Sequence, residues 1–117
     1  MKKLFIVLIG FFSVFIFSNC GSGKKVAGKV IPKSTYAANL STVIMENCTP
    51  CHIPAKGGFK KAYDNYDNVK TDIDEMIRRI GLLPTEKGFM PFKKTAPLPD
   101  TTIAKFKKWR DDGLLEK

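Results

Sequence analysis

The apolar positions near the start of the chain are continuous, whereas those further on are periodic. An almost unbroken apolar run, residues 4–17, follows the basic start Met1-Lys2-Lys3. The run is shorter than the roughly 20 residues that a membrane-spanning helix needs. A basic start before a short apolar core is typical of a secretory signal. We therefore assign residues 1–19 to a signal peptide and exclude them from the folded domain.

A first helix is predicted over residues 35–47. Its apolar positions are spaced by four, three and one residues, which places them on one helical face: Tyr36, Leu40, Val43 and Ile44. The segment after it, residues 53–62, contains Pro54, Gly57 and Gly58. These residues favour turns, so we expect a loop there.

Two further helical segments are predicted in the middle of the chain, a short one over residues 63–69 and a clearer one over residues 72–80. The second has apolar residues at i, i+3, i+4 and i+7, namely Ile73, Met76, Ile77 and Ile80. Thr71 and Asp74 resemble a capping box in which Asp replaces the usual Glu. Gly81 fits a C-terminal stop.

The last third of the chain predicts a loop followed by a helix. Residues 83–99 are interrupted by prolines and Gly88, which leave no room for regular structure. Asp100 is a good N-cap for a final helix that Gly113 ends. The expected inner side of this helix is Ile103, Phe106, Trp109 and Arg110. Because no segment alternates apolar and polar residues with period two, we expect an all-α fold.

The length and the charge of the chain indicate its domain organisation and the kinds of partner that it could bind. The chain has 117 residues, enough for one domain, which we place over residues 35–117 behind a Gly-, Lys- and Ser-rich tether over residues 20–34. Removal of residues 1–19 leaves 18 of the 20 basic residues against 11 acidic ones, a net charge of +7. A basic surface suits nucleic acid, anionic lipid or an acidic protein. Export of the chain argues against nucleic acid.

Cys20 lies where cleavage of the signal peptide is expected. The sequence Phe17-Ser18-Asn19-Cys20-Gly21 resembles the lipobox of bacterial lipoproteins, in which cleavage leaves a lipid-modified cysteine as the first residue. It departs from the usual pattern at Phe17 and Asn19. The alternative is an ordinary secretory signal, or an uncleaved anchor, with Cys20 incidental. Lipidation would make the protein a membrane-anchored lipoprotein on the extracytoplasmic, periplasmic side.

The other two cysteines lie in Cys48-Thr49-Pro50-Cys51-His52, the c-type haem attachment pattern. Two thiols must reach two vinyl groups on one edge of the macrocycle, and cysteines three residues apart lie within about one helical turn. His52, the only histidine in the chain, can then turn its imidazole toward the iron. The motif predicts one covalently attached haem c per chain.

Three other interpretations of this motif compete. A thioredoxin-type redox disulfide would be expected in a βαβ context, which the sequence lacks. A zinc site would need four ligands, and no second paired-ligand motif is present. An ordinary disulfide would be possible in an oxidising compartment. Haem is favoured because the motif is specific and because c-type haem is attached after export.

Residues 35–117 resemble the monohaem cytochrome c family in this motif and in the order of their elements. The resemblance implies a small bundle of three to five helices around the haem, with the last helix packed across the first. It also implies a second iron ligand on the loop before the last helix, which is Met90 in Gly88-Phe89-Met90-Pro91. Met76 fits the core better and Met45 is too close to Cys48. Outside candidates for a swapped ligand at high pH are Lys87, Lys93 and Lys94.

The resemblance suggests roles for several more residues. Trp109 corresponds to an aromatic residue that packs toward the haem and the first helix, and the Pro54 carbonyl is a weak candidate to accept the Nδ1 hydrogen of His52. Phe89 and Phe92 flank Met90 and are candidates to line the haem pocket; core packing is the alternative. Six loop lysines are either solvated, which is the favoured interpretation, or a docking ring for an acidic partner: Lys56, Lys60, Lys61, Lys87, Lys93 and Lys94.

The expected function is single-electron transfer rather than catalysis. With His52 and Met90 as axial ligands, no iron position is left for a substrate, and the partners would be redox proteins of the same envelope. A monomer is favoured. An open sixth position would instead give a ligand-binding, sensing or peroxidase-like haem module, although no second histidine is available as an acid–base group. A third possibility is a haem subunit of a larger oxidoreductase complex.

Overall fold

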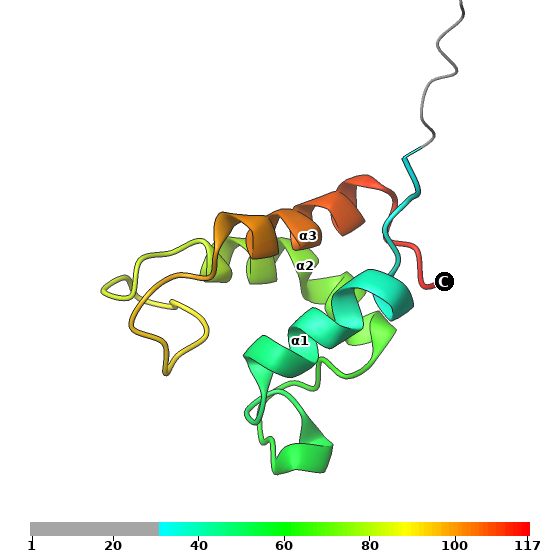
Figure 1. Cartoon of the computed structure of the whole chain (residues 1–117). Coiled ribbons are helices and arrows are strands. Elements are labelled where there is room, and N and C mark those ends of the chain that lie inside the picture. The colour runs from blue at the N-terminus through cyan, green and yellow to red at the C-terminus, as the bar shows by residue number, and fades with distance from the viewer. Residues whose placement is uncertain (1–30) are drawn as a thin grey trace, which may run out of the picture. The chain divides into compact units, whose positions relative to one another are not determined.

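The regular secondary structure of residues 31–117, the part that the computed structural model describes, is helical. In chain order the elements are η1 (Tyr36–Leu40), α1 (Ser41–Cys48), η2 (Pro54–Lys56), α2 (Tyr66–Ile80) and α3 (Asp100–Asp111) (Figure 1). Among these residues the only β-type pairing is an isolated bridge between Thr35 and Leu115, so the all-α prediction is confirmed. The predicted signal peptide, Cys20 and the tether up to residue 30 lie outside the described residues.

The first helix is continuous from residue 36 to residue 48, because η1 forms a wider π-helical turn that leads directly into α1. Thr35 is its N-cap, and the Thr35 side chain accepts a hydrogen bond from the Ala38 backbone N–H at 3.2 Å. Leu40, Val43 and Ile44 are buried, as their spacing predicts. The helix ends at Cys48, the first cysteine of the predicted motif.

α2 is one helix where the sequence suggested two segments. Its N-cap is Asn65, whose side chain accepts a hydrogen bond from the Asn68 N–H at 3.0 Å. The capping box predicted at Thr71 is wrong, because the Thr71 hydroxyl donates instead to the carbonyl of Asp67 at 2.8 Å inside the helix. Gly81 is the C-cap, as expected.

α3 begins at Asp100, with Pro99 rather than Asp100 as its N-cap. Ile103, Phe106 and Trp109 are buried, as predicted. Arg110 does not belong to the buried side. It is partly exposed and forms ion pairs with Asp111 at 2.9 Å and with Asp74 of α2 at 3.2 Å.

α3 lies alongside α2 and also contacts η1, so the two ends of the described region meet (Figure 1). The carbonyl of Leu115 accepts hydrogen bonds from the Trp109 indole at 2.7 Å and from the Tyr36 N–H at 2.8 Å. The second of these bonds satisfies the Tyr36 N–H at the start of the first helix, which has no partner within the helix. Ser34, the last residue of the predicted tether, is buried, and its N–H donates to the Asp112 carboxylate.

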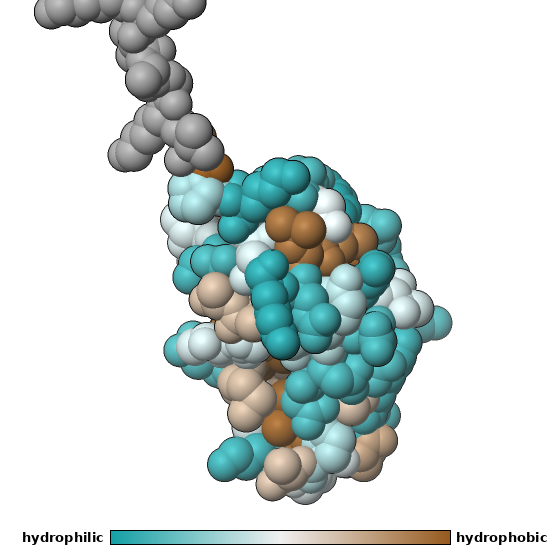
Figure 2. Space-filling model, turned by 90° about the vertical axis from the view of Figure 1, so that its right-hand side faces the viewer, coloured by the Kyte–Doolittle hydropathy of each residue, from teal (hydrophilic) through white to brown (hydrophobic). Residues whose placement is uncertain are grey.

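The core is built from all three α-helices and the turn after α1. Its fully buried side chains are Leu40, Ile44, Ile53, Val69, Phe106 and Trp109. On the face seen in Figure 2 the surface is mostly hydrophilic, with apolar residues in small patches. Phe59 and Phe92 are the most exposed of the large apolar residues, each 78% exposed. No helix within residues 31–117 has the length and apolar character needed to cross a bilayer.

Candidate functional site

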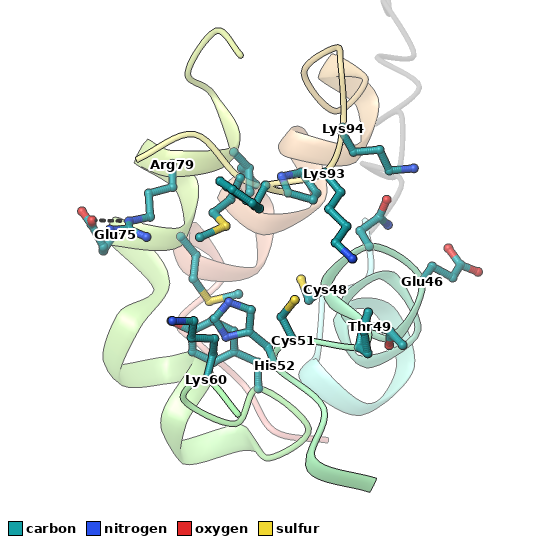
Figure 3. A pocket seen from close by; sticks show the side chains of 18 of the residues that line it. Glu46, Cys48, Thr49, Cys51, His52, Lys60, Glu75, Arg79, Lys93 and Lys94 are labelled. Carbon is teal, nitrogen blue, oxygen red and sulfur yellow. Dashed lines mark hydrogen bonds and ion pairs between the residues drawn. The ribbon is translucent and has the colours of Figure 1, made fainter. Parts of the chain in front are cut away.

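The segment Cys48–His52, which holds the sequence motif, opens into a cavity of about 810 Å³, within the usual range for small-molecule and cofactor sites. Four parts of the chain surround it: the end of α1 with the following turn, the segment 59–63, one face of α2, and the loop before α3 (Figure 3). The motif contributes all five of its residues, 48–52, to the lining. The loop contributes residues 90–94. Segments that are distant in the sequence thus share one space.

The two cysteines are presented to this cavity from a tight turn. Cys48 is the last residue of α1, and the turn is closed by hydrogen bonds from the His52 N–H to the Cys48 carbonyl and from the Ile53 N–H to the Pro50 carbonyl, both 3.0 Å. Figure 3 shows the two sulfur atoms close together and pointing into the cavity. Both thiols are free. The arrangement leaves both sulfurs available to bond one group inside the cavity.

Gly58 packs directly against the back of this turn. A Cβ at residue 58 would lie 2.5 Å from the Pro50 carbonyl oxygen, 2.7 Å from the Ile53 nitrogen and 2.8 Å from the Cys51 carbonyl oxygen. Backbone atoms cannot yield to such a contact, so only glycine fits. The glycine pair after the motif is visible in the sequence, but the close approach is not.

The imidazole of His52 is oriented by a backbone carbonyl. Its Nδ1 lies 2.8 Å from the carbonyl oxygen of Lys61. Because a carbonyl oxygen can only accept, Nδ1 carries the hydrogen, and in the neutral ring Nε2 keeps a free lone pair. The ring also stacks on Tyr63, with centroids 4.5 Å apart and planes 11° apart. The acceptor is therefore Lys61 and not Pro54, the candidate suggested by the sequence.

Two thioethers, not one, line the cavity. Met90 contributes from the loop before α3, where its N–H donates to the carbonyl of Arg79 at 3.2 Å. Met76 contributes from α2, and it is also a core residue at 5% exposure, as its place on the apolar stripe predicts. Met45 is 40% exposed and is not part of the lining. The site thus holds two soft, neutral sulfur donors besides the two cysteines.

The aromatic residues predicted near the site divide into two groups. Phe92 lines the cavity and is 78% exposed. Phe89 is buried but is not among the lining residues, which favours the packing interpretation over the pocket interpretation. Trp109 packs on the first helix, 6.2 Å from the ring of Tyr36, and does not reach the cavity. Tyr63, which was not singled out from the sequence, does line it.

Charged side chains border the cavity on several sides. Of the six loop lysines, three are lining residues, namely Lys60, Lys93 and Lys94, and they are joined by Arg79, Glu46 and Glu75 (Figure 3). Glu75 forms ion pairs with Arg78 at 2.7 Å and Arg79 at 2.8 Å, and the hydrogen bonds from these arginines lower the pKa of Glu75 to about 2. Arg79 lies three residues after Met76, a helical spacing that could have indicated its position.

The surroundings of Cys48 argue against dithiol redox chemistry. Burial raises the pKa of the Cys48 thiol to about 11, which keeps it protonated and a poor nucleophile at neutral pH. It also lies at the C-terminal end of α1, whose partial negative charge disfavours a thiolate. Among residues 31–117 no group of three or more His, Cys, Asp and Glu side chains is arranged to hold a metal ion, which disfavours a zinc site.

Comparisons of this chain with protein-family models, with curated proteins and with solved structures each found no match. Function is therefore inferred from the residues of the cavity themselves. Two adjacent thiols, an imidazole with a free Nε2 and two thioethers around one cavity are a donor set that fits a covalently attached iron porphyrin.

Proposed function

We propose that the protein is a small c-type cytochrome that passes single electrons outside the cytoplasm. The observation that carries the proposal is that Cys48, Cys51 and His52 of a haem attachment motif line one cavity together with Met90. In this proposal Cys48 and Cys51 hold the haem by thioether bonds, and His52 and Met90 are its axial ligands. When bound, the haem supplies a one-electron Fe(III)/Fe(II) couple.

The arrangement of the helices supports a cytochrome c-like bundle. α1 ends at the first cysteine of the motif, Met90 lies in the loop between α2 and α3, and α3 contacts η1. These are the relations that the resemblance to the monohaem cytochrome c family implies. The covalent haem would also enlarge the core of a domain that is otherwise small.

The free Nε2 of His52 and the soft thioether of Met90 favour transfer of electrons over catalysis. With both axial positions filled by side chains, a substrate has no place to bind at the metal. The neutral thioether stabilises the reduced state and raises the potential. The protein is thus proposed as a carrier and not as an enzyme.

The basic residues at the mouth of the cavity suggest the kind of partner. Lys60, Lys93 and Lys94 line the opening, and exposed Phe59 and Phe92 lie among them in the lining. A surface that combines lysines with exposed aromatic rings suits transient contact with an acidic redox protein. We include such a partner in the proposal.

Membrane attachment through Cys20 belongs to the same proposal. A lipid on Cys20 would keep the domain at the extracytoplasmic face of a membrane, within reach of membrane-bound redox partners. Replacement Cys20→Ala should move the protein from the membrane fraction to the soluble fraction. Unchanged membrane attachment of this variant would contradict lipidation.

Electron transfer is tested by spectroscopy of the protein co-expressed with haem-attachment machinery. A carrier with methionine ligation should show a weak far-red charge-transfer band in the ferric state, titrate reversibly with one electron, and bind CO slowly. If the band is missing and CO binds at once, the sixth position is open. The chain would then be a ligand-binding, sensing or peroxidase-like module.

A further inference from the structure

The segment from Lys60 to Tyr63 runs beside the haem attachment motif and is hydrogen-bonded to it repeatedly. The Lys60 N–H donates to the Cys51 carbonyl at 3.0 Å, and the Tyr63 N–H donates to the His52 carbonyl at 2.9 Å. Between them, the Lys61 carbonyl accepts the Nδ1 hydrogen of His52 at 2.8 Å. The position of the imidazole therefore depends on where this segment is held.

One carboxylate of α2 holds the segment on its other side. Asp72 Oδ1 accepts a hydrogen bond from Lys61 Nζ at 2.8 Å, and Asp72 Oδ2 accepts one from the Tyr63 hydroxyl at 2.9 Å. Lys61 and Tyr63 both contact the imidazole, Lys61 through its carbonyl and Tyr63 through its ring. The hydrogen bond from Lys61 lowers the pKa of Asp72, so both oxygens are acceptors at neutral pH.

Two weaker supports complete the attachment. The Asn68 side chain of α2 donates to the Ala62 carbonyl at 2.9 Å, and the Tyr36 hydroxyl donates to the Tyr63 carbonyl at 3.3 Å. The first bond holds the backbone between Lys61 and Tyr63, and the second holds the backbone of Tyr63 itself. Asp72 is distinct because it contacts the side chains of both residues that touch His52, and because its bonds are charge-assisted.

We propose that Asp72 is a positioning residue for the axial histidine, an inference that rests on the proposed function. By fixing Lys61 and Tyr63, Asp72 keeps a short hydrogen bond on Nδ1 and a stacked ring beside the imidazole. A hydrogen bond on Nδ1 makes Nε2 a stronger donor, and a stronger donor stabilises Fe(III). Loss of the clamp should reorient the imidazole and raise the reduction potential.

The test compares holoprotein carrying Asp72→Ala with holoprotein carrying Asp74→Ala. The control removes the same charge from the same helix and introduces the same good helix former. Asp74 differs in that it is 81% exposed and, within residues 31–117, has Arg110 as its one ion-pair partner. Two quantities are measured: the reduction potential, and the NMR shifts of the haem methyl groups in the ferric protein, which report the orientation of the axial imidazole.

Asp72→Ala should change the pattern of methyl shifts and raise the potential more than the control, whereas Asp74→Ala should leave the pattern as in the wild type. Asp72→Glu, which keeps the carboxylate, should restore part of the wild-type pattern. Equal effects of Asp72→Ala and Asp74→Ala would overturn the inference while leaving the proposed function intact. A wild-type protein that takes up no haem would overturn both.

Two further variants decide the matter if Asp72→Ala accumulates too little holoprotein. Tyr63→Phe keeps the stacked ring and removes one contact to Asp72, and Lys61→Met removes the other. Each variant should move the haem methyl shifts in the direction expected for Asp72→Ala, and the double variant should move them further. Wild-type patterns in both single variants and in the double variant would overturn the inference.

Discussion

Single residues decide the chemistry of this site, and the choice between two methionines is the clearest example. Met90 was expected from its place in the sequence, before a proline in the loop that precedes the last helix. Met76 was assigned to the core, and it is both buried and part of the cavity lining. A side chain fixed on α2 is less free to move to a metal than one on a loop. We therefore retain Met90 as the proposed ligand.

Replacement of each methionine by leucine separates the two roles. Met90→Leu should abolish the far-red band of the ferric protein and allow CO to bind readily, because the thioether ligand is lost. Met76→Leu is close in volume and should keep the band, with a stability loss below about 1.5 kcal/mol. Absorption spectra and CO titration of both holoproteins provide the measurement. If only Met76→Leu lost the band, Met76 and not Met90 would be the iron ligand.

The sequence alone indicated that the residues of the motif lie together, but not what orients them. The spacing implied that Cys48, Cys51 and His52 lie close together, because all three fall within five residues of the chain. They do line one cavity. The partner of His52 could not be predicted, since any residue can supply a backbone carbonyl. Which one reaches Nδ1 depends on the path of the loop and on its attachment to Asp72 of α2.

At the scale of elements, the helices were easier to predict than their ends. Apolar spacing identified the buried faces of the first helix and α2, and most of that of α3. The break predicted inside α2 was wrong. A threonine hydroxyl can cap the start of a helix, or it can donate to the carbonyl four residues earlier within a helix, and Thr71 does the second. Asn65, a stronger cap six residues before it, starts the helix instead.

The packing of α3 against the first helix predicts large stability effects. Phe106 and Trp109 of α3 are fully buried, and Trp109 lies against Tyr36 of the first helix. Phe106→Ala should lower the free energy of unfolding by about 3–5 kcal/mol, which is the usual effect of removing a buried aromatic ring. The exposed control Lys105→Ala on the same helix should change it by less than about 0.5 kcal/mol. Denaturant unfolding of the holoproteins, followed by circular dichroism, measures both values. If both substitutions changed the free energy of unfolding by similarly small amounts, the buried position of Phe106 would be contradicted.

The end of α3 predicts a dependence of stability on acid. Hydrogen bonds from Lys108 and from the Ser34 backbone lower the pKa of Asp112 below its ordinary value of 3.8. A carboxyl with a lowered folded pKa stabilises the protein above 3.8, and this contribution is lost as the pH falls through the folded pKa. Asp112→Asn should therefore melt at a lower temperature than the wild type at neutral pH.

The pH dependence of the melting temperature of Asp112→Asn shows whether the Asp112 charge stabilises the fold. As the pH falls below 3.8 and through the lowered folded pKa, the difference in melting temperature between the wild type and Asp112→Asn should shrink, because Asp112 becomes protonated. Other acidic groups titrate in both proteins and so affect both curves. A difference that stays constant from neutral pH to acid would show that the Asp112 charge does not stabilise the fold.

At the scale of the whole molecule, the chain is basic, and the cavity lining also carries more basic than acidic side chains. The full chain has a net charge of +9, and the cavity mouth carries Lys60, Lys93 and Lys94. Composition predicted the sign of this charge. It could not show which lysines border the cavity, because they come from loops on either side of α2. Lys61, which looked equivalent in the sequence, is instead engaged by Asp72.

Reversal of these three charges should change reactions with charged oxidants. The triple variant Lys60→Glu, Lys93→Glu and Lys94→Glu should react with anionic ferricyanide at least about tenfold more slowly at low salt, because attraction at the mouth becomes repulsion. Reaction with a cationic ruthenium ammine should become faster. Both effects should weaken as salt is added. Stopped-flow absorbance of the reduced holoprotein measures the rates.

A control variant reverses the same number of charges elsewhere. Lys70, Lys105 and Lys107 are exposed residues that do not line the cavity. Their replacement by glutamate alters the net charge equally, so only a general electrostatic effect should remain. Equal slowing of ferricyanide by both triple variants would show that the lysines at the mouth have no special role.

The most direct test of the account is the intact mass of the protein after co-expression with haem-attachment machinery. The account predicts a chain heavier by the mass of one haem, with the addition mapped to a peptide containing Cys48 and Cys51 and absent from the variant that has alanine at both positions. A colourless protein with the mass of the polypeptide alone and two free thiols would contradict it.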